Sequence, residues 1–507
     1  MRGMAERSKP AKQKRHVFTY QTRVCVTPEQ DKMLREYGVR FGRVERTLYG
    51  DLQKGEAANR LKAEYLVRFA ITARQFNAAR IQLQGKIEAI RQLLPLQVAN
   101  LQTRIGRAKK IVARLTKRLP GSNRLHQKRR RLAGLEQRWE QLEAERKAGQ
   151  IHLCFGSKKL FHSQFHLAEN GFPSHAEWKQ AWSEARSSQF FVLGSKDETA
   201  GCQGCVATRN RDGSYDLRVR LPNAAREKHL VIPGVRFRYG QEQLEESLAA
   251  SRALSYRFLR DAKGWRIFVA MEGSPGKRIS DRRLGAIGID INLEQLVLAE
   301  LDRFGNFLGG DCIGCVTYGK RRAQAKAILG DAVKQVMAAA IRTRKPIVVE
   351  CLEFAKKKST LENAGRGRAR LLSSFAYQQT LRYLKAAGFR AGVEVIPVHS
   401  AYSSTIGAVN YAARLGISIH QGAAIAIARR GLGLSERPAV RVAQLPTRRG
   451  GHVTLPLPAR NRSKHVWSLW SKVSRRIRAA LAAPVQLLPA TRGSTPASLC
   501  LQTPCAT

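Results

Sequence analysis

Two carboxylates in the second half of the chain are the residues best suited to chemistry. Asp290 interrupts the apolar strand pattern of residues 286–291, and Glu350 follows the apolar run 347–349. A charge in such a run is costly unless a metal ion or a partner compensates it. Neighbouring strands of one sheet can bring both side chains to a shared site, where carboxylates hold Mg²⁺ for phosphodiester hydrolysis. A purely structural interpretation stays open, in which Asp290 begins a turn and Glu350 caps a strand.

The composition indicates a polyanionic partner. Lysine and arginine total 90 against 38 acidic residues, a formal net charge of +52. Self-repulsion of this size is relieved by binding to a phosphate backbone, which also releases counterions. A solvated basic surface or a ribosome-associated protein is the alternative, and it too points to nucleic acid.

The length of 507 residues indicates two to four domains. Hydrophobic residues make up 43% of the chain, enough to build cores, and no apolar run is long enough to span a bilayer. We therefore expect a cytoplasmic protein that associates with the nucleoid when bound to DNA. Nine cysteines, an odd number, argue against a disulfide framework.

Local patterns divide the chain into regions of different character. A strand alternation precedes a capping box at Thr27 and Gln30, a coiled-coil seam begins at Leu94, and hairpin signals surround residues 261–264. Beyond residue 284, antiparallel strand patterns are followed by alternating helix and strand, the order expected of an RNase H-like fold. We predict a multidomain α+β chain with these boundaries: basic leader 1–16, strand 17–27, helical lobe 28–149, β-rich domain 150–283, α/β domain 284–434 and irregular basic tail 435–507.

Five segments carry a resemblance to a known family. They are residues 154–161 (CFGSKKLF), 288–292 (GIDIN), 348–352 (VVECL), 401–407 (AYSSTIG) and 418–430 (SIHQGAAIAIARR). In this order they resemble motifs of TnpB-type, transposon-associated nucleases and of type V CRISPR effectors, whose nuclease domain is of the RuvC type.

The resemblance implies an RNA-guided DNA endonuclease. A guide RNA would fill the basic groove between a recognition lobe and the nuclease domain, and it would pair with target DNA. The strand and sheet on either side of the helical lobe would form a wedge domain. Asp290 and Glu350 would hold Mg²⁺ or Mn²⁺, and His420 would complete the catalytic site.

His420 departs from the family pattern, which places an aspartate there. No aspartate follows Asp331 anywhere in the chain. A neutral imidazole can bind a divalent metal or act as a general base, but Mg²⁺ prefers oxygen, so a histidine ligand favours Mn²⁺. The alternative is a residue at a helix N-terminus with no metal role.

Zinc is not expected. The segment 404–418, where the family carries a zinc knuckle, contains no cysteine. The pairs Cys202/Cys205 and Cys312/Cys315 have spacing suited to zinc, but they fall in different predicted domains. Ordinary reduced thiols are the favoured interpretation.

Basic side chains near these motifs are candidates for contact with nucleic acid phosphates. They are Lys158, Lys159, Lys356, Lys357, Lys358, Arg366, Arg368, Arg370, Arg429 and Arg430. Solvated loops and charge at a helix C-terminus are the structural alternatives.

Three functions remain open from the sequence. The first is an RNA-guided, metal-dependent DNA endonuclease. The second is an RNA-guided DNA binder or repressor that does not cut, which the missing aspartate favours. The third is an RNA-binding protein with a decayed nuclease fold. The sequence leaves the oligomeric state open.

Overall fold

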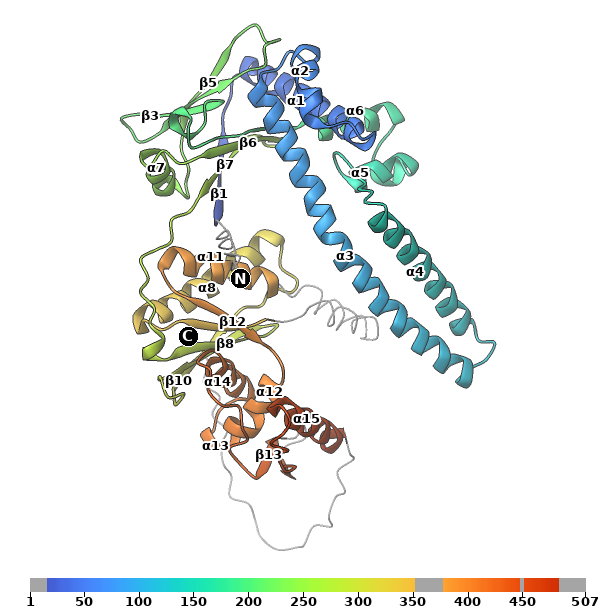
Figure 1. Cartoon of the computed structure of the whole chain (residues 1–507), viewed down its shortest axis with the longest axis vertical. Coiled ribbons are helices and arrows are strands. Elements are labelled where there is room, and N and C mark those ends of the chain that lie inside the picture. Colours follow the sequence, from blue (N-terminus) through green and yellow to red (C-terminus); the bar gives the residue numbers. More distant parts are fainter. Residues whose placement is uncertain (1–15, 352–376, 447–450, 483–507) are drawn as a thin grey trace, which may run out of the picture. The chain divides into compact units, whose positions relative to one another are not determined.

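The computed structural model describes residues 16–351, 377–446 and 451–482. These residues divide into two compact units between Ser274 and Pro275. We call them the N-terminal unit and the C-terminal unit, and Figure 1 shows their elements. Both contain helices and sheets, as expected for a multidomain α+β chain. None of the described helices is long and apolar enough to cross a membrane.

In the N-terminal unit the main elements are β1 (Val17–Val24), α1 (Pro28–Gln53), α2 (Ala58–Arg68), α3 (Ala73–Arg118), α4 (Asn123–Lys147), α5 (Lys158–His162), α6 (His175–Ser187), β2 (Gln189–Val192), β3 (Cys205–Arg209), β4 (Tyr215–Arg220), β5 (His229–Val235), α7 (Gln241–Ala249), β6 (Leu254–Asp261) and β7 (Gly264–Glu272). Helix α1 starts at the predicted capping box of Thr27 and Gln30. Local interactions set the start of α1, because the side chain of each residue accepts a hydrogen bond from the backbone N–H of the other.

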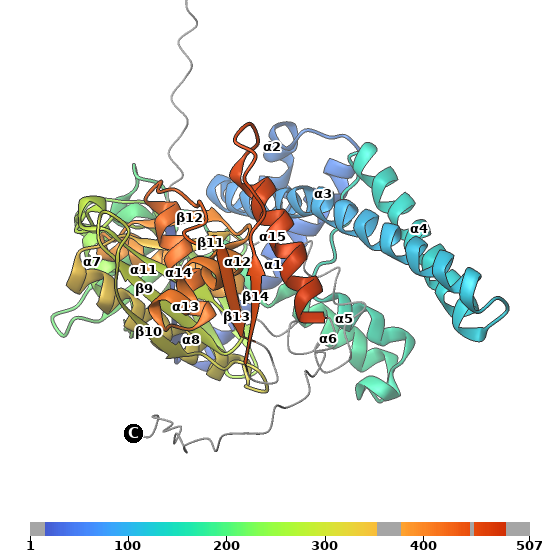
Figure 2. The same ribbon diagram turned by 90° about the horizontal axis from the view of Figure 1, so that it is seen from below.

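Helices α3 and α4 form an antiparallel hairpin, visible in Figures 1 and 2. Its seam is narrow and apolar, as the sequence predicts, because buried residues recur every three or four positions on one face. The buried side chains are Leu94, Val98, Leu101, Ile105, Leu135 and Leu142.

Two sheets build the core of the N-terminal unit, with strand orders β1-β7-β6-β2 and β3-β4-β5. Every second side chain of β7 is buried, and Trp265 donates its indole N–H to Asp31 over 2.8 Å. Strand β1 pairs with β7, so helices α1 to α6 lie in sequence between the first and second strands of one sheet. The helical lobe is therefore an insertion into a β-rich sheet.

In the C-terminal unit the main elements are β8 (Ala286–Ile291), β9 (Gln295–Leu301), β10 (Phe307–Gly314), α8 (Arg322–Thr343), β11 (Ile347–Cys351), α11 (Tyr377–Ala391), β12 (Val395–His399), α12 (Ser403–Ile406), a π-helical turn (Gly407–Ala412), α13 (Ala413–Leu415), α14 (Ile419–Gly431), β13 (Val442–Pro446), β14 (His452–Pro456) and α15 (Val466–Ala482).

The central sheet of this unit has the strand order β10-β9-β8-β11-β12. Strands β8, β9 and β10 are antiparallel, whereas β11 runs parallel to β8 and to β12. A parallel pair needs a crossover, which α8 provides between β10 and β11. In Figure 1, α8 and α11 cover one face of the sheet and α14 covers the other.

Helix α14 approaches the sheet closely because small residues line its contacts. A Cβ atom on Gly288 of β8 would lie 2.0 Å from the carbonyl oxygen of Ala424. On the far side of α14, a Cβ on Gly407 would lie 2.4 Å from the amide nitrogen of Ala423. Backbone-to-backbone packing on both sides fixes the position of α14, and with it the side chains of its first turn.

Part of the segment that the sequence analysis places in an irregular tail is ordered: β13 and β14 pair as antiparallel strands, and α15 follows them. Leu469, Trp470 and Val473 of α15 are buried in the core that contains β8 and α14. Figure 2 shows α15 beside the hairpin. Glu436 anchors the helix, because its carboxylate accepts from Trp467 Nε1 at 2.9 Å and its carbonyl accepts from Trp470 Nε1 at 2.7 Å.

Candidate active site

Asp290 and Glu350 occupy neighbouring positions on two parallel strands. The register pairs Val349 of β11 with Ile289 of β8, so each carboxylate follows a paired residue at the same edge of the sheet. Both side chains are buried, Asp290 with 6% of its surface exposed and Glu350 with 8%. Burying two carboxylates side by side is unfavourable unless cations or hydrogen-bond donors compensate their charges.

His420 contacts Asp290 from the first turn of α14. A capping box of Ser418 and Gln421 starts this helix. His420 Nδ1 lies 2.9 Å from Asp290 Oδ2, and the amide of Asn292 donates to the same oxygen over 2.9 Å. The structure thus brings together two residues that are 130 positions apart in the sequence.

Glu350 is held by residues to which the sequence analysis gave no role. The hydroxyl of Ser403 donates to Glu350 Oε1, and the hydroxyl of Tyr377 donates to the Glu350 carbonyl oxygen. Ser403 is 2% exposed. It lies in the segment 401–407 that carries the family resemblance, so the position was detectable, but its contact with Glu350, 53 positions earlier, depends on long-range packing.

The pKa of His420 is raised by its hydrogen bond to Asp290, against a lowering by partial burial. A raised pKa means that the folded state binds the proton more tightly than the unfolded chain. The stabilisation is fully present below the unfolded pKa of histidine and is lost as the pH rises through the folded pKa. Because 49% of the side chain is exposed, solvent screening keeps the contribution below about 1 kcal/mol.

We therefore expect the melting temperatures of the wild-type protein and the variant His420→Asn to differ more at pH 6 than at pH 8.5. The measurement is thermal unfolding in EDTA, so that no divalent ion competes for Asp290. A difference that grows with pH would contradict a charged pair between His420 and Asp290.

The donors at this site suit a divalent cation that keeps part of its water shell. In the described part of the chain, no three His, Cys, Asp or Glu side chains come together as a complete cation site. Mg²⁺, however, usually takes one or two carboxylates and fills its remaining positions with water and substrate phosphates. Asp290 and Glu350 meet that requirement. In this structure the imidazole of His420 contacts the carboxylate of Asp290, so His420 lies beside the two candidate ligands.

The predicted phosphate-binding residues have different environments. Lys158 and Lys159 are exposed on α5. Arg429 donates to the carbonyl oxygen of Gly305 over 2.8 Å. Arg430 pairs with Glu436 and donates to backbone carbonyls of β12 and of the turn that follows it.

Arg429 and Arg430 are thus engaged with internal acceptors, and their contact with phosphate stays a prediction. The remaining predicted contacts lie outside the described residues: Lys356, Lys357, Lys358, Arg366, Arg368 and Arg370.

The two cysteine pairs lie in different units. Cys202 and Cys205 are fully buried in the N-terminal unit, where burial raises the pKa of both thiols. In the C-terminal unit Cys315 is buried and Cys312 is exposed. A buried thiol with a raised pKa is a poor nucleophile and a poor metal ligand.

Comparison with known proteins gives little further guidance. The sequence matches no protein-family model and no curated protein. Among solved structures, the chain is similar to a chain from the cryo-EM structure of a CRISPR-Cas12f ternary complex. The identity is 11%, the match covers 82% of this chain and 98% of that chain, and the TM-score is 0.19. A likeness at this level assigns neither a fold nor a function to the chain.

Proposed function

We propose that this protein is an RNA-guided DNA-binding protein with a RuvC-type, divalent-metal-dependent endonuclease site. The observation that carries the proposal is the pair of buried carboxylates, Asp290 and Glu350, at neighbouring positions of two parallel strands. The strand order of their sheet, three antiparallel strands followed by two parallel ones, is that expected of an RNase H-like nuclease domain.

Charge and motifs support the nucleic acid part of the proposal. A net charge of +52 favours a polyanionic partner held through many phosphate contacts. That the partners are a guide RNA and a target DNA is what the resemblance of the five segments to TnpB-type and type V proteins implies. A helical lobe inserted into a sheet, as in the N-terminal unit, is the domain order of that family.

Each residue of the site has a separate role in the proposed chemistry. Asp290 and Glu350 would hold Mg²⁺ or Mn²⁺, which when bound supplies an activated water and stabilises the leaving oxygen. The Asn292 amide and the Ser403 hydroxyl orient the two carboxylates. His420 places one ring nitrogen on Asp290, which leaves Nε2 to exchange a proton with water near neutral pH.

A second function, guide-dependent DNA binding without cleavage, is favoured by one observation. His420 occupies the position of the family's third carboxylate and contacts Asp290 Oδ2, so it can compete with a metal for that oxygen when it is protonated. This function retains both nucleic acid partners and removes only the catalytic step.

A plasmid library with randomised flanking sequence separates the two functions. The full chain, purified with its native RNA, is incubated with the library in Mg²⁺ or in Mn²⁺. Cuts that depend on guide pairing and on a short flanking motif are the expected result. Guide-dependent retention of uncut DNA in both metals would establish the second function, and retention of RNA without any selectivity for matched DNA would contradict both.

A further inference from the structure

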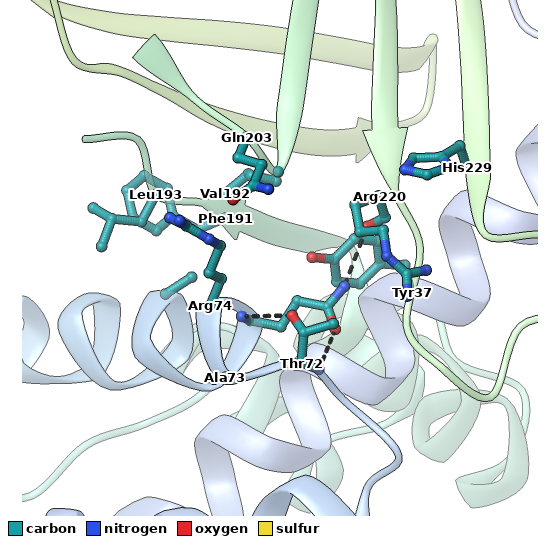
Figure 3. Close-up of a pocket in the computed structure, with 13 residues that line it drawn as sticks. Tyr37, Thr72, Ala73, Arg74, Phe191, Val192, Leu193, Gln203, Arg220 and His229 are labelled. Carbon is teal, nitrogen blue, oxygen red and sulfur yellow. Dashed lines mark hydrogen bonds between the residues drawn. The ribbon is translucent and has the colours of Figure 1, made fainter. Parts of the chain in front are cut away.

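A cavity of about 340 Å³ in the N-terminal unit has no role in the nuclease site. Its walls come from α1, the start of α3, the edge strand β2 and the adjoining strands β4 and β5 (Figure 3). Its volume falls within the range of small-molecule sites, about 300–1,000 Å³. The residues that matter for its chemistry are Tyr37, Arg74, Phe191, Gln203, Arg220 and His229.

Aromatic and aliphatic side chains form part of the cavity wall. Tyr37 is 3% exposed, and its ring stacks on Phe190 with 4.0 Å between centroids. Phe191 and Leu193 line the opposite side of the cavity, as Figure 3 shows. Aromatic and aliphatic walls of this kind accept a planar ring, because every nucleobase has a π-face that can stack against them.

The edge of β2 adds backbone hydrogen-bonding groups to the wall of the cavity. This strand ends its sheet, whose order is β1-β7-β6-β2. Arg260 N donates to Ser188 O over 2.8 Å, and hydrogen-bonded pairs alternate along an antiparallel ladder. The register therefore points the N–H and C=O of Phe191 away from β6, toward the open edge that borders the cavity. A donor next to an acceptor matches the polar edge of a nucleobase.

The rim of the cavity is positive. The guanidinium of Arg220 donates to three uncharged oxygen acceptors, the carbonyls of Leu221 and Lys228 and the side-chain amide of Asn223. The pKa of His229 is lowered, first by partial burial and then by the neighbouring cations Arg218, Arg220 and Lys228. Arg74 pairs with Glu198, the one acid in contact with this rim among the described residues.

The first turn of α3 adds to the positive electrostatic potential at the rim of the cavity. Its capping box satisfies the N–H groups of Thr72 and Gln75, whereas the N–H groups of Ala73 and Arg74 have no partner within the helix. Both residues line the cavity. Helix N-termini favour anions, and here the effect reinforces the charge of Arg220.

We propose that this cavity binds one nucleotide, with its base against Phe191 and its phosphate at the rim formed by Arg220, His229 and the start of α3. The source that fits the chain best is a single nucleotide of the guide RNA, turned out of its stack. That assignment rests on the RNA-binding part of the proposed function. A free nucleotide has the same chemistry, so the experiment must distinguish the two sources.

The test fills the cavity without removing any charge. Ala73→Phe places a ring in the cavity, and Ala63→Phe, at an exposed position of α2, is the matched control. Gln203→Ala serves as a second variant, because it shortens an exposed lining side chain with little risk to folding. The readouts are the affinity of each full-length protein for the native RNA and ultraviolet cross-linking of the RNA-loaded protein, followed by mass spectrometry.

The expected result is a nucleotide cross-linked to the peptide that contains Phe191. Ala73→Phe should remove the cross-link and weaken RNA binding about tenfold, the effect of losing one stacked base. Ala63→Phe should change neither readout. Unchanged affinity in both cavity variants, with no cross-link in the wild type, would overturn the inference and leave the proposed function standing.

A wild-type protein that retains no RNA would instead contradict the proposed function. Equilibrium dialysis with AMP, GMP, CMP and UMP then decides the inference. Binding that Ala73→Phe abolishes would identify a free-nucleotide site. No binding of any of the four would overturn the cavity assignment as well.

Discussion

Replacing Glu350 with glutamine is expected to slow the cleavage of guide-matched DNA by at least about 1,000-fold, because several kcal/mol of metal and charge stabilisation are lost. Binding of the same DNA should not change. Glutamine keeps the volume of the side chain and an oxygen that can accept the hydrogen bond of Ser403. The variant therefore removes a charge and leaves the local packing intact.

Glu294→Gln is the matched control, since it makes the same change at an exposed position in the turn between β8 and β9. Cleavage is measured under single-turnover conditions, and DNA binding is measured by retention of a labelled target. If Glu350→Gln cleaves as fast as the control, the carboxylate holds no catalytic metal. If it loses DNA binding as well, its role is structural.

The second large effect is expected at Gly288, where the sheet meets α14. A Cβ at this position would lie 2.0 Å from Ala424 O and 2.8 Å from Ala428 Cβ, so the helix must move to accept it. Overpacking of a core costs about 1–3 kcal/mol. Gly288→Ala should therefore lower the free energy of unfolding of the C-terminal unit by at least this amount. It should also slow cleavage, because α14 carries His420.

Gly309→Ala is the control for this prediction. Gly309 lies on β10 of the same sheet, and a Cβ there meets no atom within 4 Å. Its effect on stability should stay within about 0.5 kcal/mol. The stability of both variants is measured by calorimetry, and their cleavage rates are then measured in the same assay. Equal stability of the two would mean that α14 does not pack on the sheet as described.

Features set by local physics were predictable from the sequence. The capping box at Thr27 and the seam that begins at Leu94 depend on residues three or four positions apart. The proximity of Asp290 and Glu350 was expected because both carboxylates follow apolar runs that suit neighbouring strands. These predictions need only the period of a helix or strand and the geometry of a sheet.

The family resemblance predicted that His420 shares a site with Asp290 and Glu350, but the individual contacts set by long-range packing were not predictable. The contact between His420 and Asp290 depends on how closely α14 lies on β8, and that depends on glycines whose effect appears only in three dimensions. For Arg430, which was predicted to contact phosphate, the sequence does not show that its guanidinium meets Glu436. Helix α15 was missed for a related reason. Its buried face of Leu469, Trp470 and Val473 is embedded in a strongly basic segment that resembles a solvated tail.

The most direct test of the account is cleavage of one guide-matched plasmid by the wild-type protein and by Asp290→Asn, both loaded with native RNA. Asp311→Asn, an exposed carboxylate on β10, is the control. We predict guide-dependent cuts by the wild type and by Asp311→Asn in Mn²⁺ or Mg²⁺, and no cuts by Asp290→Asn although it still retains the plasmid. Cleavage by Asp290→Asn at the wild-type rate would contradict a nuclease centre built on Asp290 and Glu350.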